Sequence, residues 1–162
     1  MRTITQEELS QILTDHVLWL KDNSIGERAN LTDANLTDAN LTNANLADAN
    51  LTDANLFGAN LTNANLSGAN LTGANLTNVH LTGVNLAGAN LSDADLAGAN
   101  LSGTNLSDTN LSHAYLIGAK FDINIINATS IYYATFSKDA LMWLIPRDDW
   151  AKVKDAVKII DN

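Results

Sequence analysis

The sequence predicts a mainly β fold in which the chain turns a sharp corner every five residues. Leucine occupies every fifth position from Leu31 to Leu116, eighteen times without a gap. This period matches neither the 3.6-residue turn of a helix nor the two-residue alternation of a strand. A corner once per repeat is therefore needed to keep leucine on one side of the chain.

The residue two places after each leucine supplies this corner. It is Gly in eight repeats, Asp in six, Asn in three and His113 in one. These residue types tolerate positive φ, which a type II turn requires at its third residue. Each pentapeptide is thus expected to be a short extended piece followed by a turn. Leu and the small Ala before it face inward, while Asn, Thr or Ser and the turn residue face outward.

The A-N-L-T/S-x pattern resembles the pentapeptide repeat family over residues 29–138. The resemblance implies a right-handed quadrilateral β-helix with four pentapeptides in each coil and about 5.5 coils. The period of five by itself leaves three or four corners per coil open. Stacked coils would bury a column of leucine beside a column of alanine. The expected core includes Leu31, Leu51, Leu66, Leu86, Leu106, Phe121 and Phe136.

Residues 1–28 are expected to form a capping α-helix and a linker, because a solenoid without a cap exposes an open edge. Thr5 and Glu8 have the spacing of a capping box, and Ile4 and Leu9 that of a hydrophobic staple. The helix is expected to end near Asp22. Its apolar stripe is Leu9, Ile12, Leu13, His16, Val17 and Leu20. His16, Trp19 and Leu20 resemble a helix that precedes the repeats in many family members.

The repeat becomes more apolar near Lys120. Its central residues there are Phe121, Ile126, Ile131 and Phe136, and its outward positions include Ile123, Ile125, Tyr132 and Tyr133. Outward apolar residues on a hydrophilic coil indicate a covered surface. We expect the C-terminal segment or a second subunit to lie there.

Residues 139–162 are expected to form two helical pieces. The first is the apolar segment 140–145, and the second starts at Pro146, which suits the first turn of a helix. Trp150, Val153, Val157 and Ile160 form the apolar stripe of the second piece. This segment is either a second cap or the interface of a homodimer, and the sequence leaves both open.

The charge balance excludes several classes of protein. The 162 residues include 9 Lys and Arg against 18 Asp and Glu, a net charge of -9. This argues against direct nucleic-acid binding through a basic face and against a polybasic membrane anchor. There is no cysteine, and no apolar run approaches the ~20 residues of a membrane span. The acidic residues near the N-terminus do not fit a signal peptide, so the expected location is cytoplasmic.

The sequence offers no constellation for catalysis, and we expect no enzymatic activity, cofactor or metal. His16, His80 and His113 do not converge at the spacing of metal ligands. Asp33 and Asp53 fall one coil apart and could share a cation, but solvated turn residues are the simpler interpretation. There is no nucleophile motif and no phosphate-binding glycine loop, and a core of Leu and Ala leaves no pocket.

Three hypotheses about function remain. The first is a rigid scaffold for an unknown protein partner, with Asp33, Asp53 and the outward apolar residues Ile123, Ile125, Tyr132 and Tyr133 as the candidate surface. The second follows from the family resemblance, because some members mimic duplex DNA and bind type II topoisomerases. The third is binding to ice or a polymer through ladders of Thr and Ser. The predicted leucine core has a consequence for stability that does not depend on the function. Leu66→Asp should disrupt the stack of coils, whereas Thr72→Ala should have little effect.

Overall fold

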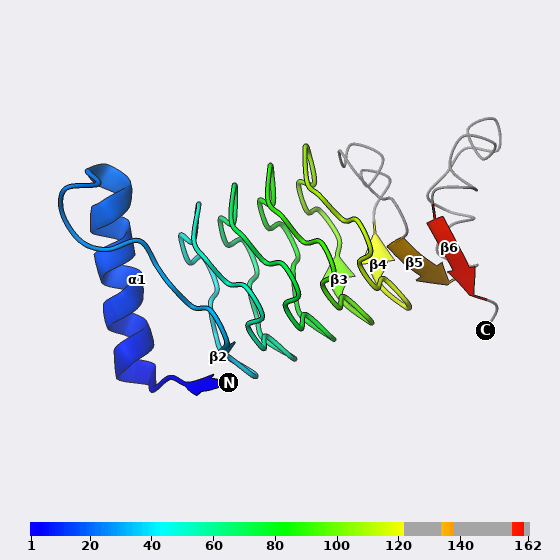
Figure 1. Ribbon diagram of the computed structural model, residues 1–162, viewed down its shortest axis with the longest axis horizontal. Helices are drawn as coiled ribbons and strands as arrows, with labels where there is room; N and C mark the ends of the chain where they lie inside the picture. The colour runs from blue at the N-terminus through cyan, green and yellow to red at the C-terminus, as the bar shows by residue number, and fades with distance from the viewer. Residues whose placement is uncertain (122–133, 138–156, 161–162) are drawn as a thin grey trace.

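The computed structural model describes residues 1–121, 134–137 and 157–160, and it shows a stack of coils with a helix across one end (Figure 1). The N-terminal helix α1 lies beside the first coil, and strands β5 and β6 lie at the far end of the stack. The elements are β1 (Arg2–Thr3), α1 (Gln6–Lys21), β2 (Ala34–Asn35), β3 (Asn100–Leu101), β4 (Lys120–Phe121), β5 (Ala134–Ser137) and β6 (Val157–Ile160).

Each coil contains twenty residues, and therefore four pentapeptides. Parallel bridges join residues twenty apart, as in Asn30 with Asn50 and Asn50 with Asn70. The same register continues from Tyr115 to Thr135 in β5. A coil of three repeats would have paired residues fifteen apart. The structure therefore settles the number of corners, which the period of five had left open.

The corner that the sequence predicts is present in every repeat from Leu31 to Gly118. All eighteen turn residues have φ between 55° and 70°, and ten of them are not glycine. In the first repeat the Ala34 N–H donates to the Leu31 carbonyl oxygen at 3.1 Å. This bond between the first and fourth residues, with positive φ at the third, is the type II pattern.

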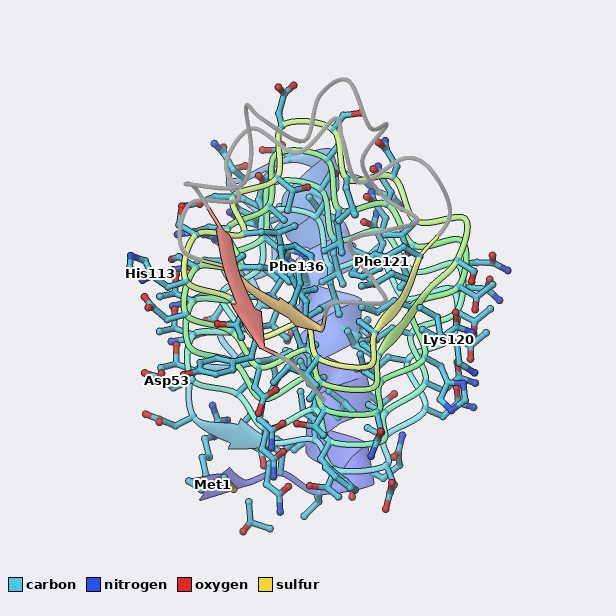
Figure 2. The ribbon with its side chains drawn as sticks, turned by 90° about the vertical axis from the view of Figure 1, so that its right-hand side faces the viewer. Met1, Asp53, His113, Lys120, Phe121 and Phe136 are labelled. Atoms are coloured by element: carbon cyan, nitrogen blue, oxygen red, sulfur yellow. The ribbon has the colours of Figure 1, made fainter. Side chains whose placement is uncertain are left out.

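Leucine and alanine fill the interior of the stack. No leucine of the repeats exposes more than 3% of its surface, and Leu31, Leu51, Leu66 and Leu86 expose none. Phe136 continues the column with 1% exposure, and Phe121 packs against it with ring centroids 6.4 Å apart. Figure 2, viewed along the stack, shows both rings inside the outline of the coil. Burial of each leucine contributes about 1.5–3 kcal/mol before the entropy cost of ordering it.

Two alanine positions hold threonine instead, and their hydroxyls are satisfied inside the core. Thr104 and Thr109 are buried. Each donates its hydroxyl hydrogen at 2.8 Å to the carbonyl oxygen of a leucine in the preceding coil, Leu81 and Leu86 respectively. A buried hydroxyl without a partner would cost stability, so these bonds explain why the core tolerates the exchange.

Every backbone N–H of a regular repeat has a partner. In the repeat 69–73, the N–H groups of Asn70, Leu71 and Gly73 donate to carbonyl oxygens of neighbouring coils. The Ala69 N–H closes the preceding turn. The Thr72 N–H donates to a side chain of its own repeat, the Asn70 Oδ1, at 3.1 Å. The asparagine side chain thus completes the hydrogen bonding of a backbone that neighbouring coils alone do not satisfy.

Helix α1 begins with half of the predicted capping box. The Glu8 N–H donates to the Thr5 Oγ1 at 3.1 Å. The Glu8 carboxylate forms an ion pair with Arg2 instead of returning to the Thr5 N–H. Arg2 is held nearby because β1 pairs in parallel with β2, an N-terminal strand that the sequence analysis did not predict. The helix ends at Lys21, with Asp22 as its C-cap.

His16 joins the helix to the first coil. Its side chain has no exposed surface, and its Nδ1 accepts a hydrogen bond from the Ala29 N–H at 3.1 Å. The ring stacks on Trp19 with centroids 5.6 Å apart. Gly26 brings the linker back against the helix at φ 69°, where an added Cβ would meet the Asp15 carbonyl oxygen at 2.2 Å.

The prediction of a C-terminal helix is wrong for residues 157–160. They form β6, which pairs in parallel with β5 in the register Ala134 with Val157 and Ser137 with Ile160. The physical reason is the open edge of the last coil, which offers backbone partners to a segment rich in β-branched residues. The proposed helical residues 139–156, and also Ile126 and Ile131, lie outside the described residues.

Candidate interaction surface

Four faces follow from a coil of four pentapeptides, and their chemistry differs. We name each face after one residue. Each face consists of one pentapeptide of the first coil and the pentapeptides that follow it at intervals of twenty residues. The first pentapeptide is 29–33 for the Thr32 face, 34–38 for the Phe57 face, 39–43 for the Thr62 face and 44–48 for the Ser67 face.

The threonine ladder of the Thr32 face is internally hydrogen-bonded. The Thr52 and Thr72 hydroxyls each donate at 2.7 Å to the Oδ1 of the asparagine two residues earlier. The Thr52 Oγ1 in turn accepts from the Asn70 Nδ2 of the next coil at 3.0 Å. Each hydroxyl hydrogen is therefore already committed within the protein. The threonines of this ladder therefore offer no free hydroxyl donor to an external lattice.

The Phe57 face is the most apolar of the four. Phe57 and Tyr115 expose 41% and 49% of their surfaces, although the repeat places Thr and Asn at their positions. The column of Phe57 also contains Thr37, Thr77 and the half-buried Ala97 and Ile117. The equivalent column of the Thr32 face consists only of hydroxyl residues: Thr32, Thr52, Thr72, Ser92 and Ser112.

The Phe57 face is also the longest face within the described residues. Its ladder begins at β1, where Thr3 pairs with Asn35, and passes through residues 55, 75, 95 and 115. It then continues through β5 into β6. Both terminal strands are therefore added to this one face. The Met1 side chain lies against this face, since the Asn55 Nδ2 contacts the Met1 Sδ at 4.0 Å.

Carboxylates border the Phe57 face. Asp33, Asp53 and Asp93 occupy the corner that leads into it, all exposed. Asp38 lies at its other corner and Asp95 on the face itself. Residues 29–119 contain seven Asp and no Lys, Arg or Glu, so no cation of the repeats offsets this charge. Figure 2 shows Asp53 and His113 on one side of the stack and Lys120 on the opposite side.

Asp33 and Asp53 lie one coil apart, as their spacing indicated, and both have φ 55°. No group of three or more His, Asp or Glu side chains suited to a metal occurs in the part of the chain that the structure describes. His80 lies on the Thr62 face, His113 lies at the corner of the Thr32 face, and His16 is buried under α1. The other predicted surface residues, Ile123, Ile125, Tyr132 and Tyr133, lie outside the described residues.

Burial changes the pKa of His16. Loss of solvent lowers it from its ordinary value of 6.5, and Arg28 acts in the same direction. The Ala47 backbone and the Asp48 carboxylate oppose this shift. The neutral ring carries its hydrogen on Nε2, because Nδ1 accepts from Ala29; Nε2 is buried without a hydrogen-bond partner. This imidazole is suited to holding the cap in place.

An open hollow beside the end of α1 is lined by Trp19, Leu20, Lys21, Asp22, Asn23 and Asp48. It brings together neither a nucleophile with a base nor a set of metal ligands. Among the helices of the described residues, none has the length and apolar character to cross a membrane.

Sorting the sequence into four columns with a period of twenty would have shown the character of the Phe57 face. Phe57 taken alone is an isolated outward aromatic, which is common on protein surfaces. Its relation to Tyr115 and to Asp33, Asp53 and Asp93 depends on the number of repeats in a coil. The period of five does not give that number.

Comparison with known proteins agrees with this architecture. The model of a family described as pentapeptide repeats matches eight copies, over residues 27–63, 54–93 and 89–122. No curated protein sequence matches the chain significantly.

Solved structures of similar proteins share the fold. The pentapeptide repeat protein Rfr23 from the cyanobacterium Cyanothece 51142 is 29% identical, with a TM-score of 0.56, over 69% of this chain and 97% of that one. A pentapeptide repeat protein from the Arabidopsis thaliana thylakoid lumen is 23% identical, with a TM-score of 0.53, over 80% of this chain and 77% of that one.

Full-length QnrB1, a plasmid-mediated fluoroquinolone resistance protein, is 18% identical over 76% of this chain and 74% of its own, with a TM-score of 0.42. That score is too low to support an inference about this chain. Pentapeptide repeat proteins form a right-handed β-helix. The matched segments cover more than half of the sequence, and the chain belongs to the pentapeptide repeat family.

Proposed function

We propose that this protein is a rigid, non-enzymatic scaffold that binds another protein through its outer faces. The observation that carries the proposal is the contrast between a filled core and a differentiated surface. Leucine and alanine, with two valines and two threonines at alanine positions, occupy the interior from Ala29 to Ala119. Phe57 and Tyr115, in contrast, are exposed on one face, where the repeat itself requires neither.

Rigidity is supported by the hydrogen bonds of the coils. Each regular repeat bonds to the coil before it and the coil after it, and the asparagine ladders add bonds between side chains. A surface that is ordered before binding loses little conformational entropy when a partner binds. We further propose a cytoplasmic location, an unidentified protein partner and a homodimer through the C-terminal end.

Mimicry of DNA toward a type II topoisomerase is the alternative proposal, and its support is the acidic surface. Eighteen repeats at four per coil span about 22 Å at the strand spacing of ~4.8 Å. A DNA duplex of that length carries about 13 charges. The repeats carry seven carboxylates, roughly half that density.

Binding to ice or a polymer has less support, because the threonine hydroxyl hydrogens are bonded internally.

Affinity capture tests the scaffold proposal. The full chain is immobilised and compared with Phe57→Thr/His80→Asn/Tyr115→Asn, which returns three exposed positions to the repeat pattern. We expect the natural chain to enrich a small set of proteins saturably from an extract of the cells that make it, and the variant to lose part of that set. Identical capture by both chains at tens of micromolar would contradict the proposal.

A supercoiling assay separates the alternative. The protein is titrated into DNA gyrase with and without a fluoroquinolone, at two salt concentrations. A scaffold of the proposed kind has no effect at tens of micromolar. Inhibition or protection that weakens with salt would instead favour DNA mimicry, because exposed charges are screened by salt.

A further inference from the structure

We propose that the Phe57 face binds a basic amphipathic helix of a partner protein. This inference rests on the proposed scaffold function and deepens it by naming the face and the chemistry of the partner. The face combines exposed aromatic groups with bordering carboxylates, and the other three faces lack this combination.

The apolar part of the face matches one side of a short helix. Phe57 and Tyr115 belong to coils three steps apart, through residues 75 and 95. At a strand spacing of ~4.8 Å this is about 14 Å along the stack. A helix rises 1.5 Å per residue, so about ten residues of helix would cover both side chains. The half-buried residues Asn75, Thr77, Asp95 and Ala97 lie between them on the face, and half-buried Ile117 lies beside Tyr115.

The charge of the face selects a cationic partner. Asp33, Asp53 and Asp93 line one border, with Asp38 and Asp95 nearby, and all but Asp95 are exposed. A helix with leucine on one side and lysine flanking it would place cations beside these carboxylates and apolar groups on the aromatics. Complementary charge guides the encounter and fixes the orientation of the helix. The aromatic side chains, which the bound helix would bury, supply most of the affinity.

The opposite corner of the coil provides an internal contrast. The turn column between the Thr62 and Ser67 faces is Asn43, Asn63, Gly83 and Gly103, with no charge at any position. Five of the seven carboxylates of the repeats therefore lie on or beside the face that carries the aromatic groups, while Asp48 and Asp108 lie at the far side of the Thr32 face. An even distribution would be expected if the acidic residues served only solubility.

The test uses the full chain and a labelled 18-residue peptide of Leu and Lys, with leucine at i, i+3, i+4 and i+7 spacing. A scrambled peptide of the same composition lacks the apolar side and controls for charge. The first protein variant is Phe57→Thr/Tyr115→Asn, which restores the residue types of the repeat and so preserves the fold. Fluorescence anisotropy at physiological salt gives the dissociation constants.

A second pair of variants isolates the charges. Asp53→Asn/Asp93→Asn removes two carboxylates at the border of the Phe57 face, and Asp48→Asn/Asp108→Asn removes two at the far side of the Thr32 face. Asn43, at φ 59°, shows that asparagine accepts this turn conformation. Circular dichroism of each variant confirms that the fold is retained.

We expect the aromatic variant to weaken binding of the amphipathic peptide about tenfold and Asp53→Asn/Asp93→Asn about threefold, with the far pair changing it less than twofold. Equal binding of the scrambled peptide, or equal losses in both aspartate pairs, would overturn the inference by showing attraction to charge alone. Self-association abolished by Phe57→Thr/Tyr115→Asn in sedimentation velocity would also overturn it, since a second copy would then occupy the face.

Failure of this inference is distinguishable from failure of the scaffold proposal. If the peptide does not bind but the full chain still captures proteins that the repeat-restored variant loses, the scaffold stands and the partner has other chemistry. If neither occurs, both proposals fail.

Discussion

Asparagine precedes most of the leucines, and its side chain explains this repetition. In the described repeats its Oδ1 accepts the N–H two residues later, as Asn70 does for Thr72 at 3.1 Å. Its Nδ2 donates to the preceding coil, to Thr52 from Asn70. Asp95 performs only the first task, accepting from the Ala97 N–H at 3.0 Å. Asparagine therefore recurs because of the hydrogen bonds that its side chain makes, even though its position faces outward.

Replacing Asn70 tests this explanation. Asn70→Ala should lower the free energy of unfolding by about 1–2 kcal/mol, because the Thr72 N–H and hydroxyl both lose an acceptor. Asn70→Asp keeps the acceptor and should cost less. Urea unfolding compares the two variants, and equal losses would mean that the acceptor does not matter.

Thr72→Ala is expected to cost more than the sequence suggested. The Thr72 Oγ1 donates to Asn70 and accepts from the Asn90 Nδ2 at 3.0 Å. Loss of both bonds at a half-buried site should lower the free energy of unfolding by about 0.5–1.5 kcal/mol. Ala87 occupies the same slot of the repeat naturally, so the fold itself should persist in urea unfolding experiments.

His16 predicts a pH dependence. Its pKa is lowered by burial in the folded state, so the unfolded chain binds more protons than the folded one below pH 6.5. The free energy of unfolding should therefore fall as the pH decreases from about 6.5. Urea unfolding at several pH values between 5 and 8 measures this change in the free energy of unfolding. His16→Asn should flatten the slope, and a slope unchanged by this substitution would contradict the account.

At the scale of the elements, α1 depends on its N-cap residue, Thr5. Thr5→Ala removes the acceptor of the Glu8 N–H and should lower the free energy of unfolding by about 1 kcal/mol. Thr14→Ala is a matched control, because the Thr14 hydroxyl donates only to the Ser10 carbonyl of its own helix. Thermal unfolding monitored by circular dichroism compares them. Comparable losses in both variants would show that the cap has no special role.

The elements also show which parts of the fold could be predicted from the sequence. The capping helix and all eighteen corners followed from local patterns, since a cap and a turn are decided by a few adjacent residues. β1 and β6 did not, because each becomes a strand only by pairing with an edge that the coils provide. Val157 and Ile160 fit a helical stripe equally well, so tertiary pairing decides between the two structures.

At the scale of the molecule, the register of twenty converts a uniform repeat into four distinct faces. The period of five gave the core, and the family resemblance implied the four corners, but the Phe57 face depends on both together. Phe57 and Tyr115 are 58 positions apart in the sequence and share a face only because of this register. The sequence therefore identified Asp33 and Asp53 at the border of this face, whereas Phe57 and Tyr115 each looked like an isolated outward aromatic.

Deletions change this register in a predictable way. Removal of residues 69–88 takes out one full coil and should leave Phe57 and Tyr115 on the same face, with cooperative unfolding at lower stability. Removal of residues 69–73 alone should rotate every later repeat by one face and separate the two aromatics. Peptide binding should then weaken in the shorter deletion relative to the longer one. Equal binding by both would be evidence against a shared face.

The most direct test of the four-faced coil uses engineered disulfides, which the absence of native cysteine makes clean. Thr52→Cys/Thr72→Cys joins positions twenty apart, whose Cα atoms are expected about 4.8 Å from each other on adjacent coils. Thr52→Cys/Ser67→Cys joins positions fifteen apart, on different faces. Mild oxidation followed by mass spectrometry of the folded chain should show an intramolecular disulfide in the first variant and free thiols in the second. A disulfide in the second variant and free thiols in the first would contradict the register on which the four faces, and the proposed binding surface, depend.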